Sequence, residues 1–379
     1  MSLNVFAIFL NTKLIPLLLA IFGFGLLITV HELGHFIFCK IFNIYTPTFS
    51  IGIGPKIIEK KIGSTNFRLS AIPLGGYVEI AGLAEAGGQG EQKLATMKGD
   101  GSFADKPFWQ KALVLLGGII FNLLFAYTAF SFVYFYGIPK QTANISISTK
   151  INKGFQEKYN LKPEDNIISI NSETLSTNPK ELVPVIQKQF MDLSKKTTEP
   201  ETLNIIVLRD NKEINLSLKL ETEKEKDAFM ASIELKSTPI VGEYERYPLF
   251  SAISKGIHVT NQWAYQIVYG IKYLITQKTL KGAGGPIMIL SKTFETAQKG
   301  FLPLLVFLAI ISVNLAIINL LPIGALDGGQ LLFTTIEAII RRPIPEIIKV
   351  GVNIASWVLI LGLILYLSYK DLMLLIFNQ

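Results

Sequence analysis

The chain contains a long apolar run that ends in the pentapeptide His31-Glu32-Leu33-Gly34-His35. Residues 14–30 carry no charge, and apolar residues resume at positions 36–38. A run of this length predicts a helix that crosses the hydrocarbon core of a bilayer, which takes about 20 residues. Three ionisable side chains at the end of such a helix are costly in lipid, so the pattern indicates a functional site.

The two histidines of this pentapeptide are spaced to bind one metal ion. Residues i and i+4 of a helix lie on the same face, which brings the imidazoles of His31 and His35 together. This is the HExxH spacing that binds Zn²⁺, and Glu32 between them is positioned to activate a metal-bound water. The chain has only three histidines, so a chance pair at this spacing is unusual. The alternative, polar residues that cap a helix end at the membrane interface, is disfavoured.

The composition predicts a multi-pass α-helical membrane protein. Half of the residues are hydrophobic and only 17% are charged, which is typical of membrane proteins. Only Lys13 precedes the first run and no small-residue cleavage site follows it, so we interpret it as a retained transmembrane helix. The net charge of +7 is spread over the chain, which excludes nucleic acid as an expected partner and favours a membrane surface. The four uncharged runs of spanning length are 14–30, 112–139, 301–326 and 350–369.

Composition shifts along the chain divide it into segments, with one β-rich soluble domain inserted between the transmembrane helices. In that domain we expect strands at 145–151, 167–170, 203–209 and 214–220 and a helix at 180–193. The predicted segments are 1–39 (transmembrane helix 1 with the metal motif), 40–108 (a membrane-associated β-loop, then a mobile loop at 81–101), 109–139 (transmembrane helix 2), 140–240 (the soluble domain), 241–300 (an interfacial amphipathic segment with an aromatic belt), 301–329 (transmembrane helix 3), 330–349 (a connection) and 350–379 (transmembrane helix 4 and tail). The aromatic residues of the segment 241–300 could equally form a stripe that faces a protein core.

Asp327 is the expected third metal ligand. It is the only charged residue between Lys299 and Glu337. Pro322 breaks the preceding helix and Gly328 frees the chain to turn, and broken helices within membranes line cavities or pack on protein. A catalytic zinc site needs three protein ligands and an open position. The alternative is that Asp327 marks a helix end or caps the next helix.

Two asparagines on the third span are polar residues in an apolar helix. Asn319 lies two turns before Asp327 and could donate a hydrogen bond to a tetrahedral oxyanion, whereas Asn314 could equally hold two helices together. Basic residues in the short loops after spans one and three place these loops in the cytoplasm. The N-terminus, the soluble domain and the C-terminus then lie outside.

The ordered motifs resemble the site-2 protease family of intramembrane zinc metalloproteases, in particular its bacterial RseP type. The resemblance covers nearly the whole chain. The soluble insertion is similar to a single PDZ domain at 161–171 (LKPEDNIISIN) and 209–211 (RDN), although Asn160 and Glu164 replace glycines that are common there. Besides HExxH, the matching motifs are 72–77 (IPLGGY), 106–110 (KPFWQ), 284–287 (GGPI) and 319–328 (NLLPIGALDG).

The resemblance implies a zinc metalloendopeptidase that hydrolyses a peptide bond in the plane of the bacterial cytoplasmic membrane. Glu32 would be the general base, Asn319 a further catalytic residue, and the β-loop at Gly75, Gly76 and Tyr77 would hold the unwound substrate. The implied substrates are single-span membrane proteins of the anti-sigma-factor type, already trimmed by a site-1 protease, and remnant signal peptides. The PDZ-like domain would then act outside the membrane as a size filter.

Two departures from the family pattern lie away from the metal and acid–base positions. Ile119 and Gly324 stand where the family often has proline, so we expect altered helix geometry and retained chemistry. Other classes remain as alternatives: a receptor or scaffold with a vestigial metal site, a metal transporter, and a soluble-type zinc protease on a membrane anchor. The transporter would need more intramembrane carboxylates or histidines than these spans offer, and the anchored protease would carry its HExxH outside the apolar run.

Overall fold

The structure of the 379-residue chain is a computed structural model. It describes residues 10–83, 101–148, 153–178, 201–276 and 283–377, and positions 99, 181, 182, 184–186, 188, 189 and 280 between them. The predicted mobile loop at 81–101 therefore lies largely outside the described residues. Of the predicted helix at 180–193 seven residues are described, and all seven are helical. The chain forms two compact units, one from Met1–Tyr136 with Tyr247–Gln379 and the other from Gly137–Arg246.

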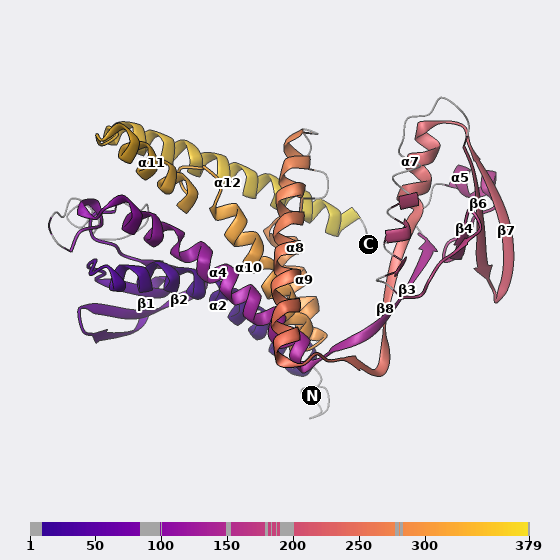
Figure 1. Cartoon of the computed structure of the whole chain (residues 1–379), viewed down its shortest axis with the longest axis horizontal. Coiled ribbons are helices and arrows are strands. Elements are labelled where there is room, and N and C mark those ends of the chain that lie inside the picture. Colours follow the sequence, from indigo (N-terminus) through magenta and orange to yellow (C-terminus); the bar gives the residue numbers. More distant parts are fainter. Residues whose placement is uncertain are drawn as a thin grey trace. The chain divides into compact units, whose positions relative to one another are not determined.

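The first unit is mainly helical (Figure 1). Among the residues that the structure describes, four helices of this unit are long and apolar enough to cross a membrane. The four candidate spans agree with the four predicted from the sequence, so the chain is a multi-pass membrane protein. The third helix ends at Asn319, before Pro322 where the sequence pattern placed the break. The four are α2 (Ile15–Ile41, preceded by a π-helical turn at Leu10–Leu14), α4 (Phe108–Tyr136), α10 (Phe301–Asn319) and α12 (Glu346–Phe377).

Helices α2 and α4 cross in backbone contact. A Cβ atom added to Gly34 would lie 2.1 Å from the carbonyl oxygen of Gly117, and one added to Gly117 would lie 2.6 Å from that of Gly34. No side chain fits at such a crossing, so both positions require glycine. Further along α4, Ala126 and Ala129 pack against α10 in a buried cluster. Small residues therefore let α4 lie centrally between α2 and α10.

A long hairpin of β1 (Thr48–Ile62) and β2 (Thr65–Val78) follows α2. Residues 49–51 have partners on both sides, at 67–69 and at 76–78, and 67–69 pair in addition with 58–60. Both strands therefore turn sharply, and β1 does so directly after residue 51. The turn uses the left-handed backbone of Gly52 and Gly54, at φ +86° and +90°, which glycine adopts without strain. The Phe36 ring of α2 packs on Phe49 and Phe67 of the hairpin. The hairpin is thus fixed on the same helix that carries the HExxH motif.

Helix α8 (Leu249–Thr276) corresponds to the predicted interfacial segment. Its first half packs on α4 and α10, with Val259 and Trp263 in a shared buried cluster, and the hydroxyl of Tyr127 on α4 donates to Asn261. Tyr269 and Tyr273 near its end are exposed. One part of α8 is therefore covered by neighbouring helices, whereas its aromatic end is open.

The last helix is tied to the segment before α9 (Pro286–Gln298) by a buried carboxylate. Asp371 of α12 is 1% exposed and accepts hydrogen bonds from the backbone N–H groups of Gly285 and Met288 at 3.1 and 2.9 Å. It satisfies donors that the first turn of a helix leaves unpaired. Helix α11 (Asp327–Ile340) lies between α10 and α12 in the sequence. It begins in the last residues of the segment predicted as transmembrane helix 3 and continues into the predicted connection.

The second unit is a β-sheet with two short described helices, α5 (Lys153–Tyr159) and α7 (Glu223–Ser232). The strand order is β7-β6-β4-β3-β8, with β5 beside β4. The strand predicted at 145–151 begins earlier, and the last strand was not predicted. A fully buried core that includes Phe229 and Ile145 lies on the sheet. The strands are β3 (Ile138–Ile147), β4 (Asn166–Ile170), β5 (Glu173–Thr174), β6 (Glu201–Arg209), β7 (Lys212–Leu220) and β8 (Ile233–Glu245).

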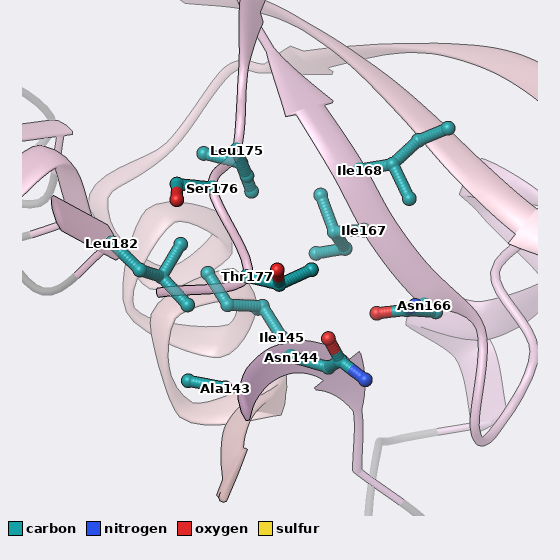
Figure 2. Close-up of a pocket in the computed structure, with 10 residues that line it drawn as sticks. All are labelled: Ala143, Asn144, Ile145, Asn166, Ile167, Ile168, Leu175, Ser176, Thr177 and Leu182. Carbon is teal, nitrogen blue, oxygen red and sulfur yellow. The ribbon is translucent and has the colours of Figure 1, made fainter. Parts of the chain in front are cut away.

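A small cavity lies where β3 and β5 diverge on the same side of β4 (Figure 2). Its volume is about 40 Å³, which is room for a few water molecules. Asn166 and Asn144 contribute polar groups, and Ile145 and Leu182 contribute apolar ones.

Candidate metal centre

His31, His35 and Asp327 converge in the structure. The Nε2 atoms of the two histidines lie 3.2 Å apart, and Oδ2 of Asp327 lies 3.2 Å from that of His31 and 3.6 Å from that of His35. Within the described ranges, this is the only group of three or more His, Cys, Asp or Glu residues arranged to hold a metal ion. The structure thus brings together the three ligands expected from the sequence.

Helix geometry and a tight turn account for this convergence. His31 and His35 are one turn apart on α2, and Asp327 is the first residue of α11, directly after the turn at 320–326. The turn folds so closely that a Cβ on Gly328 would lie 2.4 Å from the carbonyl oxygen of Leu320. Glycine at this position therefore lets Asp327 reach the histidines of α2.

The donor set fits zinc. Ligand atoms at about 2.0–2.1 Å from a tetrahedral Zn²⁺ lie about 3.3 Å from one another, and the three distances between Nε2 and Oδ2 atoms are close to that value. Oδ2 of Asp327 is buried without a hydrogen-bond donor among the described residues. A buried carboxylate oxygen beside two imidazole nitrogens is typical of a metal ligand. Three protein ligands leave the fourth position open, as catalytic zinc sites do.

Helix α4 contacts both imidazoles at Nδ1, the ring nitrogen that faces away from the ligand cluster. Nδ1 of His35 lies 2.8 Å from the carbonyl oxygen of Val114, and Nδ1 of His31 lies 3.1 Å from Nδ2 of Asn122. A Cβ on Gly118 would lie 2.4 Å from Cε1 of His31 and 2.5 Å from Nε2 of His35. Sequence reasoning did not identify Val114, Gly118 or Asn122 as site residues. The available signal for Asn122 was its polar side chain within an apolar run. The sequence carries no such signal for Val114, because it contacts His35 through its backbone carbonyl.

Glu32 lies between the metal ligands and the β-hairpin. The backbone of Val78 hydrogen-bonds its carboxylate, and a Cβ on Gly76 would lie 3.3 Å from its Cγ. Of the three predicted substrate-binding residues, Gly76 therefore lies against Glu32. Gly75 instead faces the side chain of Ile53, and the hydroxyl of Tyr77 accepts a long hydrogen bond from Arg68.

The two asparagines of the third span lie on α10 rather than in the ligand cluster. Asn319 is its last residue and is half-buried, at the start of the turn that leads to Asp327. Asn314 lies more than one turn earlier and is also half-buried. Asn319 is therefore close to the metal-binding turn in the sequence, since it directly precedes residues 320–326.

The chain is similar to a known family of peptidases. Residues 19–363 match the model of Peptidase family M50. A protein of Fusobacterium nucleatum named "Putative zinc metalloprotease" is 29% identical over 330 residues, which is 85% of this chain and 88% of that protein. Proteins with the same description from Nostoc and Helicobacter pylori are each 31% identical. The alignments cover 93% and 91% of this chain and 95% and 97% of those proteins.

Proposed function

Because the chain belongs to peptidase family M50, the site-2 protease family, and is a zinc metalloprotease, we propose that it hydrolyses membrane-spanning substrates within the bilayer. The observation that carries this proposal is the position of the metal-binding cluster. His31 and His35 lie inside the candidate span Thr12–Ile41, and Asp327 reaches them from the turn after the candidate span Phe301–Asn319. A peptide bond at this site must itself belong to a membrane segment.

The assigned residues divide the chemistry among them. His31, His35 and Asp327 would hold the zinc ion, which would supply a Lewis acid for the scissile carbonyl and for the attacking water. Glu32 takes the proton from the attacking water and passes it to the leaving amine nitrogen. Asn319 donates to the oxyanion of the tetrahedral intermediate.

The hairpin presents the substrate in an extended form. A transmembrane helix must unwind before cleavage, because its backbone carbonyls are occupied by intrahelical hydrogen bonds. An unwound segment can add as a strand along β2 near Gly75, Gly76 and Tyr77. The contact of Gly76 with Glu32 brings such a strand past the catalytic carboxylate. The lack of a side chain at Gly76 leaves room for the substrate backbone.

The unit Gly137–Arg246 acts in this proposal as one PDZ-like domain on the outer side of the bacterial cytoplasmic membrane. This interpretation is supported by the segment 161–171, which contains a turn followed by β4 at Asn166–Ile170. Its role is to exclude substrates with large outer domains, so that a site-1 protease must trim them first. The substrates are single-span proteins of the anti-sigma-factor type and remnant signal peptides. The basic loops after spans one and three place the metal site near the cytoplasmic face.

Cleavage of a reporter transmembrane helix tests the proposal. Purified protein in detergent should cleave the reporter, and both Glu32→Gln and a zinc chelator should abolish cleavage. Asn319→Ala should slow it about a hundredfold, the usual effect of losing one oxyanion donor. A reporter with a large folded outer domain should resist cleavage until that domain is removed.

Three outcomes would contradict the assignment. Equal cleavage by wild type and Glu32→Gln would exclude Glu32 as the general base. Folded, zinc-loaded protein that cleaves no transmembrane helix would favour the receptor or scaffold alternative. Cleavage of soluble casein at a rate equal to that of the reporter would exclude the restriction to membrane segments.

A further inference from the structure

We propose that Asn122 of α4 is a positioning residue for the metal site. Its amide oxygen accepts the Nδ1 proton of His31 and thereby directs the Nε2 lone pair of that imidazole toward zinc. The inference concerns zinc binding and does not depend on whether cleavage takes place within the membrane.

The two histidine ligands are held from the same helix in parallel ways. The Nδ1 atoms of His35 and His31 contact Val114 and Asn122, at 2.8 and 3.1 Å. Val114 and Asn122 are eight residues apart, which is about two helical turns, so they lie on the same side of α4. Gly118 lies midway and leaves the space that both rings occupy. Helix α4 therefore places the carbonyl oxygen of Val114 next to His35 and the side-chain amide of Asn122 next to His31.

A neutral imidazole that binds a metal through Nε2 carries its proton on Nδ1. That proton needs an acceptor, because a buried donor without one destabilises the arrangement. The carbonyl oxygen of Val114 provides an acceptor for His35 directly. For His31 the only contact of this kind among the described residues is the Asn122 amide. Asn122 is therefore the group that can fix the tautomer of His31.

The Asn122 amide has an unused acceptor in the right place. The residue is fully buried, and its Oδ1 atom has no hydrogen-bond partner among the described residues. A half-turn of the amide exchanges Oδ1 and Nδ2, because the two atoms occupy nearly equivalent positions. That orientation pairs the buried oxygen with the Nδ1 proton of His31. One rotation thus satisfies both groups.

The neighbouring helix holds Asn122 in position. The hydroxyl of Ser312 on α10 donates to the backbone carbonyl oxygen of Asn122 at 2.8 Å, and Ser312 is itself fully buried. This contact fixes the backbone of α4 at the asparagine but leaves the amide free to turn. Ser312 therefore offers a matched control, since it touches the same residue without touching the imidazole.

Zinc affinity of the full chain in detergent tests the proposal. Competition with a chelating dye should give about 10- to 100-fold weaker zinc binding for Asn122→Leu, the usual effect of losing such a partner. Asn122→Asp, which keeps an acceptor of the same size, should bind zinc within a few-fold of wild type. Ser312→Ala should also keep the wild-type affinity. Cobalt substitution should give the wild-type absorption spectrum for the aspartate variant and an altered one for the leucine variant.

Thermal unfolding in chelator shows whether a variant has lost packing instead of metal binding. The proposal requires that Asn122→Asp retain affinity even where Asn122→Leu does not fold. Wild-type affinity and cobalt spectrum in folded Asn122→Leu would overturn it. Equal losses of affinity in Asn122→Leu and Asn122→Asp would also overturn it, because the asparagine would then serve packing alone.

Discussion

Gly76 of the β-hairpin lies against Glu32 of helix α2, with an added Cβ at 3.3 Å from Cγ of the glutamate. The same added atom would lie 3.0 Å from the carbonyl oxygen of Ser50 and 3.3 Å from Cγ2 of Ile28. The hairpin strand and the helix of the HExxH motif therefore meet at a position where only glycine fits without displacement.

Gly76→Val should lower cleavage of a transmembrane reporter by about a hundredfold, because a shift of about 1 Å at a reacting group has that effect. The branched side chain must displace either Glu32 or the approaching substrate strand. Zinc content should stay at the wild-type level, since Gly76 touches none of the three ligands. Ile58→Val, on an exposed part of the hairpin, is the matched control and should cleave normally. Unchanged cleavage by Gly76→Val would contradict the proposed substrate path.

Gly118→Ala should abolish zinc binding. The added methyl group would lie within 2.6 Å of three imidazole atoms of His31 and His35, closer than carbon atoms pack, so both rings must move. Metal content of the purified variant measures the effect. Gly362→Ala is the control, because it also adds a methyl group to a glycine of a transmembrane helix but meets nothing within 4 Å. Stoichiometric zinc in Gly118→Ala would show that the rings can bind the metal from other positions.

Removal of zinc should destabilise the wild type, because a ligand that binds only the folded state stabilises it. At a free zinc concentration 100 times the dissociation constant this contribution is about 2.7 kcal/mol. Thermal unfolding with and without chelator measures it. Asp327→Asn removes the anionic ligand and should both lower the zinc content and shrink the chelator effect. Glu295→Gln, an exposed carboxylate on α9, should leave the effect unchanged. A full chelator effect in Asp327→Asn would exclude Asp327 as a ligand.

Arg209→Met should destabilise the second unit by roughly 3–5 kcal/mol, because it leaves the buried carboxylate of Asp165 without its cation. The Arg209 guanidinium donates to both carboxylate oxygens of Asp165, and Asp165 is 2% exposed. Hydrogen bonding to Asp165 raises the pKa of Arg209, so the guanidinium stays charged across the physiological pH range.

Limited proteolysis of the full chain in increasing urea measures that destabilisation. Lys140→Met is the comparison, because the Lys140–Glu243 pair is exposed on both sides and such pairs contribute about 0–1 kcal/mol. Equal protease resistance of the two variants would show that the buried pair does not stabilise the unit.

The three metal ligands were predictable because their signals are local. Two histidines one helical turn apart share a face by geometry alone, and a lone carboxylate in an apolar run needs a reason to be there. The partners of the imidazoles were not predictable in the same way. Whether Val114 and Asn122 lie beside the imidazole rings depends on how α4 is placed along α2. The backbone contact between Gly34 and Gly117 fixes that placement, and this contact is visible only in the folded structure.

The surroundings of α8 show a second limit of prediction from the sequence. An amphipathic pattern says that one face of a helix is covered, but not whether lipid headgroups or other helices cover it. The sequence therefore left an interfacial helix and a core-facing stripe both open, and in the structure Val259 and Trp263 pack on α4 and α10. The last strand, β8, was missed because its residues at 233–245 mix charged and apolar types without regular alternation.

The β-sheet unit leaves and rejoins the helical unit at neighbouring points. Its first and last strands pair at their outer ends, Ile138 with Glu245. In the helical unit, the backbone N–H of Tyr247 donates to the carbonyl oxygen of Tyr134 at 3.1 Å. An insertion with adjacent ends can be shortened, doubled or exchanged at little cost to its host. Evolution can therefore exchange this unit for another domain while the helical unit, which carries His31, His35 and Asp327, stays the same.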